Sequence, residues 1–170
     1  RFFIGIHNLI LVYNYIHGYI RCKEHPLMDN LKGIFNEHKI AYFSMEIGLS
    51  NDIPTYAGGL GVLAGDTIRS SADLNLPIVA ISLVSKMGFF KQQFDENGWQ
   101  LEHYEEWDPS KYAELLDPEI NIKIENRNVK VRAWLYKYYS FTNEMIPIIF
   151  LDTDVEENEP EDREITHYLY

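Results

Sequence analysis

The sequence predicts an α/β domain with a parallel core and β-hairpin insertions. Two largely apolar runs, KIAYFSMEIGL and LPIVAISLVS, have the character of parallel strands that are covered on both faces. A stretch with helical spacing lies between them, so the three segments form a strand, helix, strand unit of right-handed crossover type. Two later segments alternate apolar and polar residues around turn signals, which is typical of β-hairpins.

Residues 1–27 are predicted to be an extension that takes no part in the fold, with the native protein beginning at Met28, the first methionine. The run RFFIGIHNLILVYNYIHGYI is apolar enough to suggest a signal peptide or a membrane segment. Two histidines and two asparagines interrupt it, however, and no small-residue cleavage site follows. We therefore expect no membrane role, and we assign residues 28–170 to one incomplete domain.

The domain is expected to open with a short helix in DNLKGIFNEH, followed by the first apolar strand at residues 39–49. A glycine-rich stretch, IPTYAGGLGVLAGD, comes directly after that strand. Apolar residues at helical spacing then predict a helix over residues 61–74, which Asn75 and Pro77 end. The second apolar strand follows immediately.

The second half of the chain is predicted to contain both hairpins and a last buried strand. The first hairpin, GFFKQQFDENGWQLEHYE, turns at residues 95–98, and the second, INIKIENRNVKVRAWLYKYY, turns at ENRN. MIPIIFLDTD predicts the buried strand. The acidic run DVEENEPEDRE is expected to be a solvated loop that leads into a helix at DREITHYLY.

The net charge of −11 over 170 residues argues against nucleic acid and anionic membranes as partners, because both would repel such a surface. A neutral ligand, or an anion held by local groups, remains compatible with this charge. The single cysteine, Cys22, cannot form an internal disulfide, which indicates an intracellular, cytoplasmic protein. The six histidines show no metal-ligand spacing, so we expect no metal site.

The glycine-rich stretch is the first candidate for a binding site. A turn from the carboxyl end of a parallel strand into a helix presents several backbone N–H groups and the positive end of the helix dipole, which suits an anion. Gly58 and Gly59 can adopt positive φ and allow a ligand to approach the backbone closely. The stretch matches neither the G-x-G-x-x-G dinucleotide fingerprint nor a Walker A loop. Ligand binding and a tight strand-to-helix turn are therefore both open interpretations.

Two carboxylates accompany this loop. Glu46 interrupts the first strand near its carboxyl end, the edge where open α/β sheets bind ligands, and it contacts a ligand or accepts hydrogen bonds that hold the loop. Asp66 is predicted in the first turns of the helix, where a carboxylate favours the dipole with or without a ligand. Lys86 and Lys91 could supply a cation near a phosphate, or could be ordinary surface lysines.

Six aromatic residues could stack on sugar rings, although we expect most of them to lie in the core. They are Tyr56, Phe89, Phe90, Trp99, Tyr104 and Trp107. The nearby acidic residues are expected to form a solvated face and not an acid/base pair.

The chain as a whole resembles the amino-terminal part of the α-glucan phosphorylases, which act on glycogen or maltodextrin, and is most similar to their shorter bacterial and archaeal branch. The resemblance rests on AYFSMEIGLSNDIPTYAGGLGVLAGDTIRSSADLNLPIVAISLV, GFFKQQFDENGWQ, WDP and FLDTDVEENEPEDREITHYLY, and covers roughly residues 39–170. Glycogen and starch synthases share a Gly-Gly-Leu-Gly loop, but AGD after the loop and the FFKQ…GWQ block favour phosphorylase.

This resemblance implies a partial N-terminal Rossmann-like domain of a two-domain, GT-B-type glycosyltransferase, with the active site in the cleft between the domains. It implies transfer of a glucosyl unit from an α-1,4-glucan to inorganic phosphate, giving glucose 1-phosphate with retention. It also implies pyridoxal phosphate as cofactor, acting through its phosphate group. The family's loop, whose backbone amides meet the phosphate and the transferred glucose, would correspond to Gly58, Gly59, Leu60 and Gly61. Glu46, Tyr56 and Asp66 would support that loop.

Two departures from the family pattern limit what can be assigned. Gly48 stands where the larger animal-type enzymes have a tyrosine near the cofactor. The family's cofactor lysine, phosphate-binding cations and glucose-binding histidine all lie beyond Tyr170, so no catalytic residue is assignable. We expect the isolated chain to be an inactive N-terminal fragment of a protein that could assemble as a homo-oligomer. Two alternatives are a nucleotide-sugar glycogen or starch synthase and a truncated glucan-binding module.

Overall fold

The structure is a computed structural model that describes residues 40–117 and 119–169. The predicted extension, the expected helix in DNLKGIFNEH and Cys22 lie outside these residues. Among the described helices, none has the length and apolar character needed to span a bilayer.

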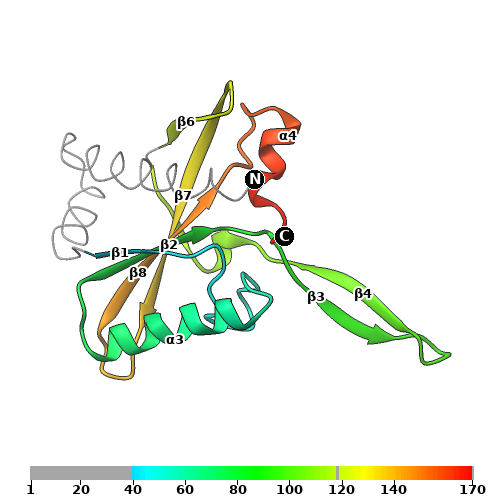
Figure 1. Cartoon of the computed structure of the whole chain (residues 1–170), viewed down its shortest axis with the longest axis horizontal. Coiled ribbons are helices and arrows are strands. Elements are labelled where there is room, and N and C mark those ends of the chain that lie inside the picture. Colours follow the sequence, from blue (N-terminus) through cyan, green and yellow to red (C-terminus); the bar gives the residue numbers. More distant parts are fainter. Residues whose placement is uncertain (1–39, 118, 170) are drawn as a thin grey trace.

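The described chain consists of a mixed sheet, one long helix, a projecting two-stranded arm and short helical turns (Figure 1). In chain order the elements are β1 (Ile40–Phe43), α3 (Gly59–Asp73), β2 (Ile78–Leu83), β3 (Met87–Phe94), β4 (Gln100–Glu106), η1 (Pro109–Lys111), β5 (Glu114–Leu115), β6 (Ile120–Ile124), β7 (Arg127–Tyr139), β8 (Met145–Asp152), α4 (Pro160–Arg163) and η2 (Glu164–Thr166).

Strands β1, β2 and β8 are parallel neighbours, with β1 at one edge of the sheet. β7 pairs antiparallel with β8, and both β5 and β6 pair antiparallel with β7. The predicted mixed α/β class is thereby confirmed, and so is the parallel pairing of the two apolar runs. The carboxyl ends of β1, β2 and β8 lie at one edge of the sheet, because the three strands run the same way.

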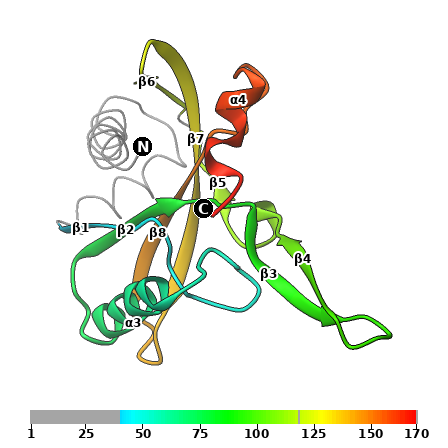
Figure 2. The same ribbon diagram turned by 45° about the vertical axis from the view of Figure 1, so that its right-hand side comes forward.

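The sheet has an apolar core on each face. Ile78 and Ala80 of β2 pack with Ile68 of α3 on one face, where the helix covers the sheet (Figures 1 and 2). Val79 and Ile81 pack with residues of β7 on the other face. Strand β2 is therefore apolar at every position except Ser82, because its alternating side chains enter two cores.

The helix and its end agree with the sequence pattern. α3 begins at Gly59, two residues before the predicted start, and ends at Asp73. Asn75 has a φ of 49° and donates its N–H to the Ala72 carbonyl at 2.9 Å, which satisfies a carbonyl in the last turn. The predicted stop at Asn75 is confirmed.

The first strand is shorter and less covered than predicted. The ladder ends at Phe43, and the Ser44 hydroxyl then donates to the Glu46 carbonyl at 2.6 Å, which turns the chain out of the sheet. Ile40 is half exposed, so β1 is not covered on both faces in the way the apolar pattern suggested. Residues 46–49 are nevertheless buried, beside α3.

Both predicted hairpins are present, but one is not part of the sheet. β3 and β4 pair only with each other and project from the body in both ribbon views (Figures 1 and 2). The expectation that most of the six aromatic residues would be core was wrong, because an isolated two-stranded arm has no core to enter. Trp107 is buried, whereas Phe90, Trp99 and Tyr104 are exposed.

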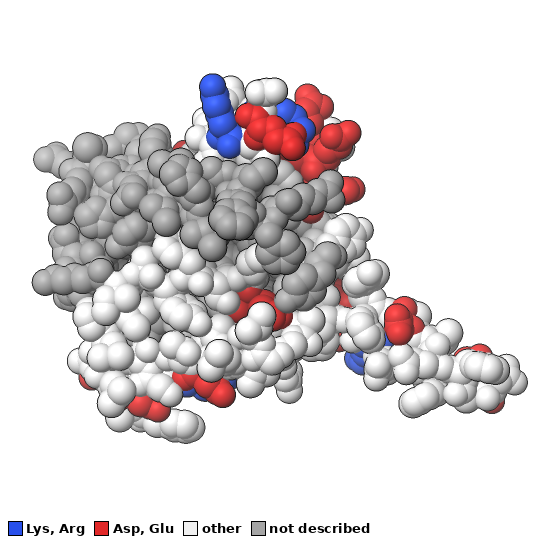
Figure 3. Space-filling model, viewed as in Figure 1, with Lys and Arg blue, Asp and Glu red and all other residues white. Residues whose placement is uncertain are grey.

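The acidic run near the carboxyl end is bound to the sheet and is not simply a solvated loop. Asp162 is buried and accepts a hydrogen bond from Arg127 at 3.0 Å. Asp154 accepts hydrogen bonds from Lys86 and from Arg163. Charges of both signs consequently gather around α4 and the tip of the β6–β7 hairpin (Figure 3). The helix α4 begins at Pro160, two residues before the predicted start at Asp162.

The contacts of Asp154 with Lys86 and Arg163 predict that part of the free energy of unfolding is lost in acid. The hydrogen bond from Lys86, assisted by Arg163 and opposed by burial, lowers the pKa of Asp154 from 3.8 to about 2. Because the folded pKa is the lower one, this contribution is complete above about pH 4 and is lost as the pH falls through about 2. The shift corresponds to about 2 kcal/mol.

We expect Asp154→Asn to lower the free energy of unfolding by roughly that amount at pH 7, and to reduce its loss between about pH 4 and pH 2. Denaturant unfolding followed by circular dichroism across this pH range measures both effects. Glu156→Gln is the matched control, because Glu156 is exposed and only two residues away. If the free energy of unfolding of Asp154→Asn and of the unmodified protein fell by the same amount over this pH range, the prediction would be contradicted.

Candidate anion-binding loop

Residues 57–61, called the amide loop below, lie at the carboxyl edge of the parallel strands and run into the first turn of α3. This is the edge at which open α/β sheets bind ligands. Gly58 is the N-cap residue of the helix, has an extended conformation with φ −144° and ψ −168°, and as a glycine has no side chain that could cap the helix. The N-cap residue therefore offers no side-chain acceptor to the first N–H groups of the helix.

Glu46 holds the amide loop through both of its carboxylate oxygens. Oε2 accepts the Ala57 N–H at 2.7 Å, and Oε1 accepts the Gly61 N–H at 3.1 Å. The residue is 3% exposed and lies three positions beyond the end of β1, outside the strand that was predicted to contain it. The structure thus contains the hydrogen bonds required by the loop-holding interpretation of Glu46.

The four glycines of the stretch meet different steric demands. A Cβ on Gly61 would lie 2.4 Å from the Tyr56 Cβ, and one on Gly65 would lie 2.1 Å from a backbone carbonyl oxygen. Such distances exclude any side chain without movement of the backbone. A Cβ on Gly58 or Gly59 would meet nothing within 4 Å. The described chain therefore needs glycine at 61 and 65, and leaves open space beside 58 and 59.

Neither Gly58 nor Gly59 has the positive φ that the sequence suggested, since Gly58 is extended and Gly59 is helical. Within residues 40–117 and 119–169, the N–H groups of Gly58, Gly59 and Leu60 have no hydrogen-bond acceptor. The Gly61 N–H is already taken by Glu46. Unpaired N–H groups at a helix N-terminus carry partial positive charge and can hold an anion.

Tyr56 packs against the amide loop instead of pointing away from it. Its ring meets Phe89 edge-on, with 5.7 Å between the ring centroids, and is partly buried. Gly48 donates its N–H to the Gly61 carbonyl at 2.8 Å. Tyr56 and Gly48 thus belong to the packing that supports the loop.

Asp66 lies in the first half of α3 but outside its first turn. It is the eighth residue of α3, near the end of the second turn, and the first turn contains no acidic residue, so Asp66 is too far along the helix to stabilise the exposed N–H groups. Its carboxylate instead accepts a hydrogen bond from Arg69 at 3.0 Å. The expected interaction with the N-terminal dipole is therefore replaced by an ion pair with the next turn.

Arg69 is a supporting residue that the sequence reasoning missed. Its Nη2 donates to the carbonyls of Gly48 at 2.8 Å and Leu49 at 2.9 Å, and so links α3 to the segment after β1. The three-residue spacing between Asp66 and Arg69 was the available signal, since such pairs share one face of a helix.

The two candidate lysines do not contact the amide loop. Lys86 is paired with Asp154, and Lys91 is exposed on the arm. No group of three or more potential metal ligands gathers within the described residues. Any cation beside an anion at the loop would have to come from elsewhere in the protein.

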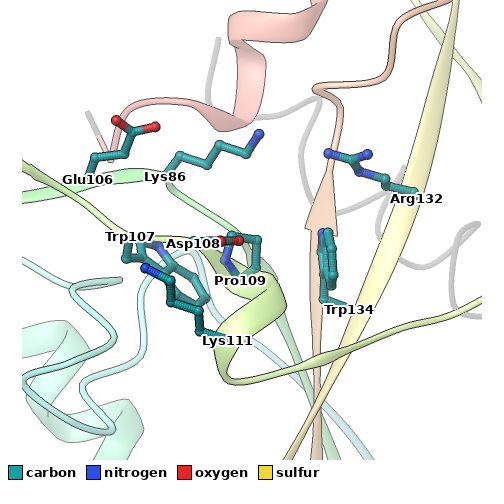
Figure 4. Close-up of a pocket in the computed structure, with 8 residues that line it drawn as sticks. All are labelled: Lys86, Glu106, Trp107, Asp108, Pro109, Lys111, Arg132 and Trp134. Atoms are coloured by element: carbon teal, nitrogen blue, oxygen red, sulfur yellow. The ribbon is translucent and has the colours of Figure 1, made fainter.

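A separate pocket of about 440 Å³ lies at the base of the arm and contains no residue of the amide loop (Figure 4). Its lining residues are Lys86, Glu106, Trp107, Asp108, Pro109, Lys111, Arg132 and Trp134. Both indole N–H groups have acceptors within the chain, and Arg132 is paired with Asp152 at 2.8 Å. Because most of its polar groups are satisfied internally, we favour the amide loop over this pocket as the ligand site.

Comparison with known proteins decides the family. The family model for carbohydrate phosphorylase matches residues 39–153. The chain belongs to the carbohydrate phosphorylase family. The resemblance inferred from the sequence motifs is therefore confirmed, and Glu46 and the amide loop both lie within the matched residues of this carbohydrate phosphorylase chain.

Several curated relatives are phosphorylases. The chain is 40% identical over 141 residues to a maltodextrin phosphorylase from Thermococcus litoralis, which covers 79% of this chain and 16% of that protein. It is 36% identical to a glycogen phosphorylase from Mycobacterium tuberculosis, covering 77% and 16%, and 34% identical to one from Aquifex aeolicus, covering 77% and 19%. The carbohydrate phosphorylase chain therefore spans less than a fifth of the length of these relatives.

Proposed function

We propose that the full-length protein carrying this chain is an α-glucan phosphorylase. It would transfer the terminal glucosyl unit of an α-1,4-glucan to inorganic phosphate and release glucose 1-phosphate. The names of the relatives, maltodextrin and glycogen phosphorylase, support this substrate class. The observation that carries the proposal is the amide loop, where three backbone N–H groups that have no acceptor among the described residues adjoin the open space at Gly58 and Gly59.

In this proposal the N–H groups of Gly58, Gly59 and Leu60 bind the phosphate and the transferred glucose. Donors that are already fixed in place stabilise developing negative charge without having to reorganise during the reaction. The Gly61 N–H makes no such contact, because Glu46 accepts it. Gly61 instead contributes the close approach that packs the loop against Tyr56.

We further propose that the chain is the N-terminal part of a Rossmann-like domain in a two-domain, GT-B-type enzyme of the cytoplasm. The parallel strands β1, β2 and β8, with α3 between β1 and β2, support this assignment. The amide loop would form one wall of the cleft. Parts of the full-length protein outside this chain would form the other wall and any homo-oligomeric interface.

Pyridoxal phosphate would be required by the full-length protein, where its phosphate group would take part in the transfer. The described residues do not offer it a lysine at the amide loop, since Lys86 is committed to Asp154 and Lys91 projects on the arm. The lysine that holds the cofactor would therefore belong to another part of the protein. Among the residues that the structure describes, the loop amides are the groups that we propose for contact with a phosphate group.

The test is to express the full reading frame and to measure glucose 1-phosphate release from an α-1,4-glucan. We expect release that requires inorganic phosphate and pyridoxal phosphate. Glucosyl transfer from ADP-glucose or UDP-glucose without phosphorolysis would instead identify a synthase, an alternative that the phosphorylase relatives do not favour. Glucan binding without either reaction would identify a binding module.

The purified chain of residues 1–170 is the companion sample in this assay. We expect it to release no glucose 1-phosphate, because it would supply only one wall of the cleft. Measurable release from this chain would contradict the assignment of the remaining catalytic groups to other parts of the protein.

A further inference from the structure

We propose that Glu46 is a positioning residue that determines which N–H groups of the amide loop remain available to the phosphate. The inference rests on the proposed function, because it concerns the same loop. It adds a specific role for a buried carboxylate that is not expected to touch the substrate.

The two N–H groups that donate to Glu46 flank the three free N–H donors in the sequence. Its oxygens accept the N–H groups of Ala57 and Gly61, at 2.7 Å and 3.1 Å. The three N–H groups between them, at residues 58–60, have no acceptor in the described structure. Glu46 therefore occupies the first and last N–H donors of the loop, so that these two cannot bind a ligand. It also fixes the backbone on both sides of the remaining three donors.

Glu46 is itself held in place by the backbone around it. The Ser44 hydroxyl donates to the Glu46 carbonyl at 2.6 Å, and Gly48 donates its N–H to the Gly61 carbonyl at 2.8 Å. Arg69 fixes the same segment from α3 through the Gly48 and Leu49 carbonyls. These contacts join the carboxylate, the loop and the helix into one unit, so a change at residue 46 should displace the donors.

The chemistry of the loop requires two acceptors at this position. A carboxylate presents two acceptor oxygens, and its hydrogen bonds to N–H groups are stronger than those of a neutral group. Glutamine has nearly the same shape but only one acceptor, and its NH₂ group would face an N–H donor. Glu46→Gln therefore breaks one of the two bonds with little change in volume.

The experiment compares Glu46→Gln with Thr55→Val in the full-length holoenzyme. Thr55 is fully buried in the same region and donates to the Ile47 carbonyl at 2.9 Å, so its replacement also removes one buried hydrogen bond. We expect kcat for Glu46→Gln to fall about ten- to a hundred-fold, with KM for the glucan within about twofold of the unmodified enzyme. Thr55→Val should retain kcat within about twofold, since that hydrogen bond does not contact the loop donors.

A second measurement does not depend on activity. We expect inorganic phosphate, compared with chloride at equal ionic strength, to raise the melting temperature of the unmodified protein and of Thr55→Val but not of Glu46→Gln. Equal kcat and equal phosphate shifts in the two variants would overturn the role of Glu46 and leave the proposed function intact. Phosphate shifts that follow the expected pattern in an inactive protein would support Glu46 and overturn phosphorolysis. No phosphate shift in an inactive unmodified protein would overturn both.

Discussion

Replacing Gly59 with alanine in the full-length protein should lower kcat for phosphorolysis at least about a hundredfold, with little change in thermal stability. A Cβ at Gly59 meets no atom of the described chain, so the folded backbone can accept it. Gly59 is also the first residue of α3, where alanine favours the helix by up to about 1 kcal/mol. The methyl group would, however, occupy the space beside the free N–H groups that the phosphate is proposed to use.

Steady-state kinetics and melting temperature together test this expectation. Ser70→Ala is the matched control, because Ser70 is an exposed residue of the same helix and lies away from the amide loop. It should leave both kcat and melting temperature close to those of the unmodified enzyme. Equal losses of activity and stability in Gly59→Ala would return the loop to the interpretation of a tight strand-to-helix turn.

Gly65→Ala should have the opposite profile and destabilise the fold by about 3 kcal/mol. A Cβ at this position would lie 2.1 Å from the Gly48 carbonyl oxygen and 3.0 Å from the Arg69 guanidinium. The backbone of α3 would have to move away from the segment after β1, and two buried surfaces would separate. Activity should fall mainly because less protein is folded.

Denaturant unfolding of Gly65→Ala beside Gly59→Ala provides a sharp comparison, since the same methyl group is added six residues apart in one helix. Ser70→Ala again reports the effect of alanine in α3 without a close contact. Unchanged stability in Gly65→Ala would mean that the helix can move away from residues 44–49 at little cost, which would also weaken the case for Glu46 as a positioning residue.

Local patterns in the sequence were sufficient for the elements that depend on their own residues. The helical spacing of α3, its end at Asn75 and the hairpin turns were all identified, because period and turn chemistry are properties of short segments. The end of β1 was not. It depends on a hydrogen bond from Ser44 and on burial of the following residues beside α3, which an apolar run does not reveal.

The errors in burial have a related cause. The acidic run was assigned to solvent because its partners, Lys86 and Arg127, lie 68 and 35 residues before the carboxylates that they contact. The aromatic residues of the arm were assigned to the core because alternation predicts a strand without saying whether another layer covers it. Both assignments required the tertiary arrangement.

The candidate site was predicted in part. The glycine pattern and a carboxylate in an apolar run were enough to select Gly58, Gly59 and Glu46. Which donors remain free could not be predicted, because Glu46 reaches residues 11 and 15 positions ahead of it. The different demands at the four glycines also depend on atoms brought close by folding.

The contact between Gly65 and the Gly48 carbonyl has a consequence for how this region tolerates mutation. Here the backbone of α3 lies directly against the backbone of the segment after β1. The distance between the two segments is therefore set by backbone atoms, and side-chain substitutions elsewhere do not change the size of those atoms. Side chains on the outer face of the helix, such as Thr67 and Ser70, can therefore diverge during evolution without displacing the donors at its start.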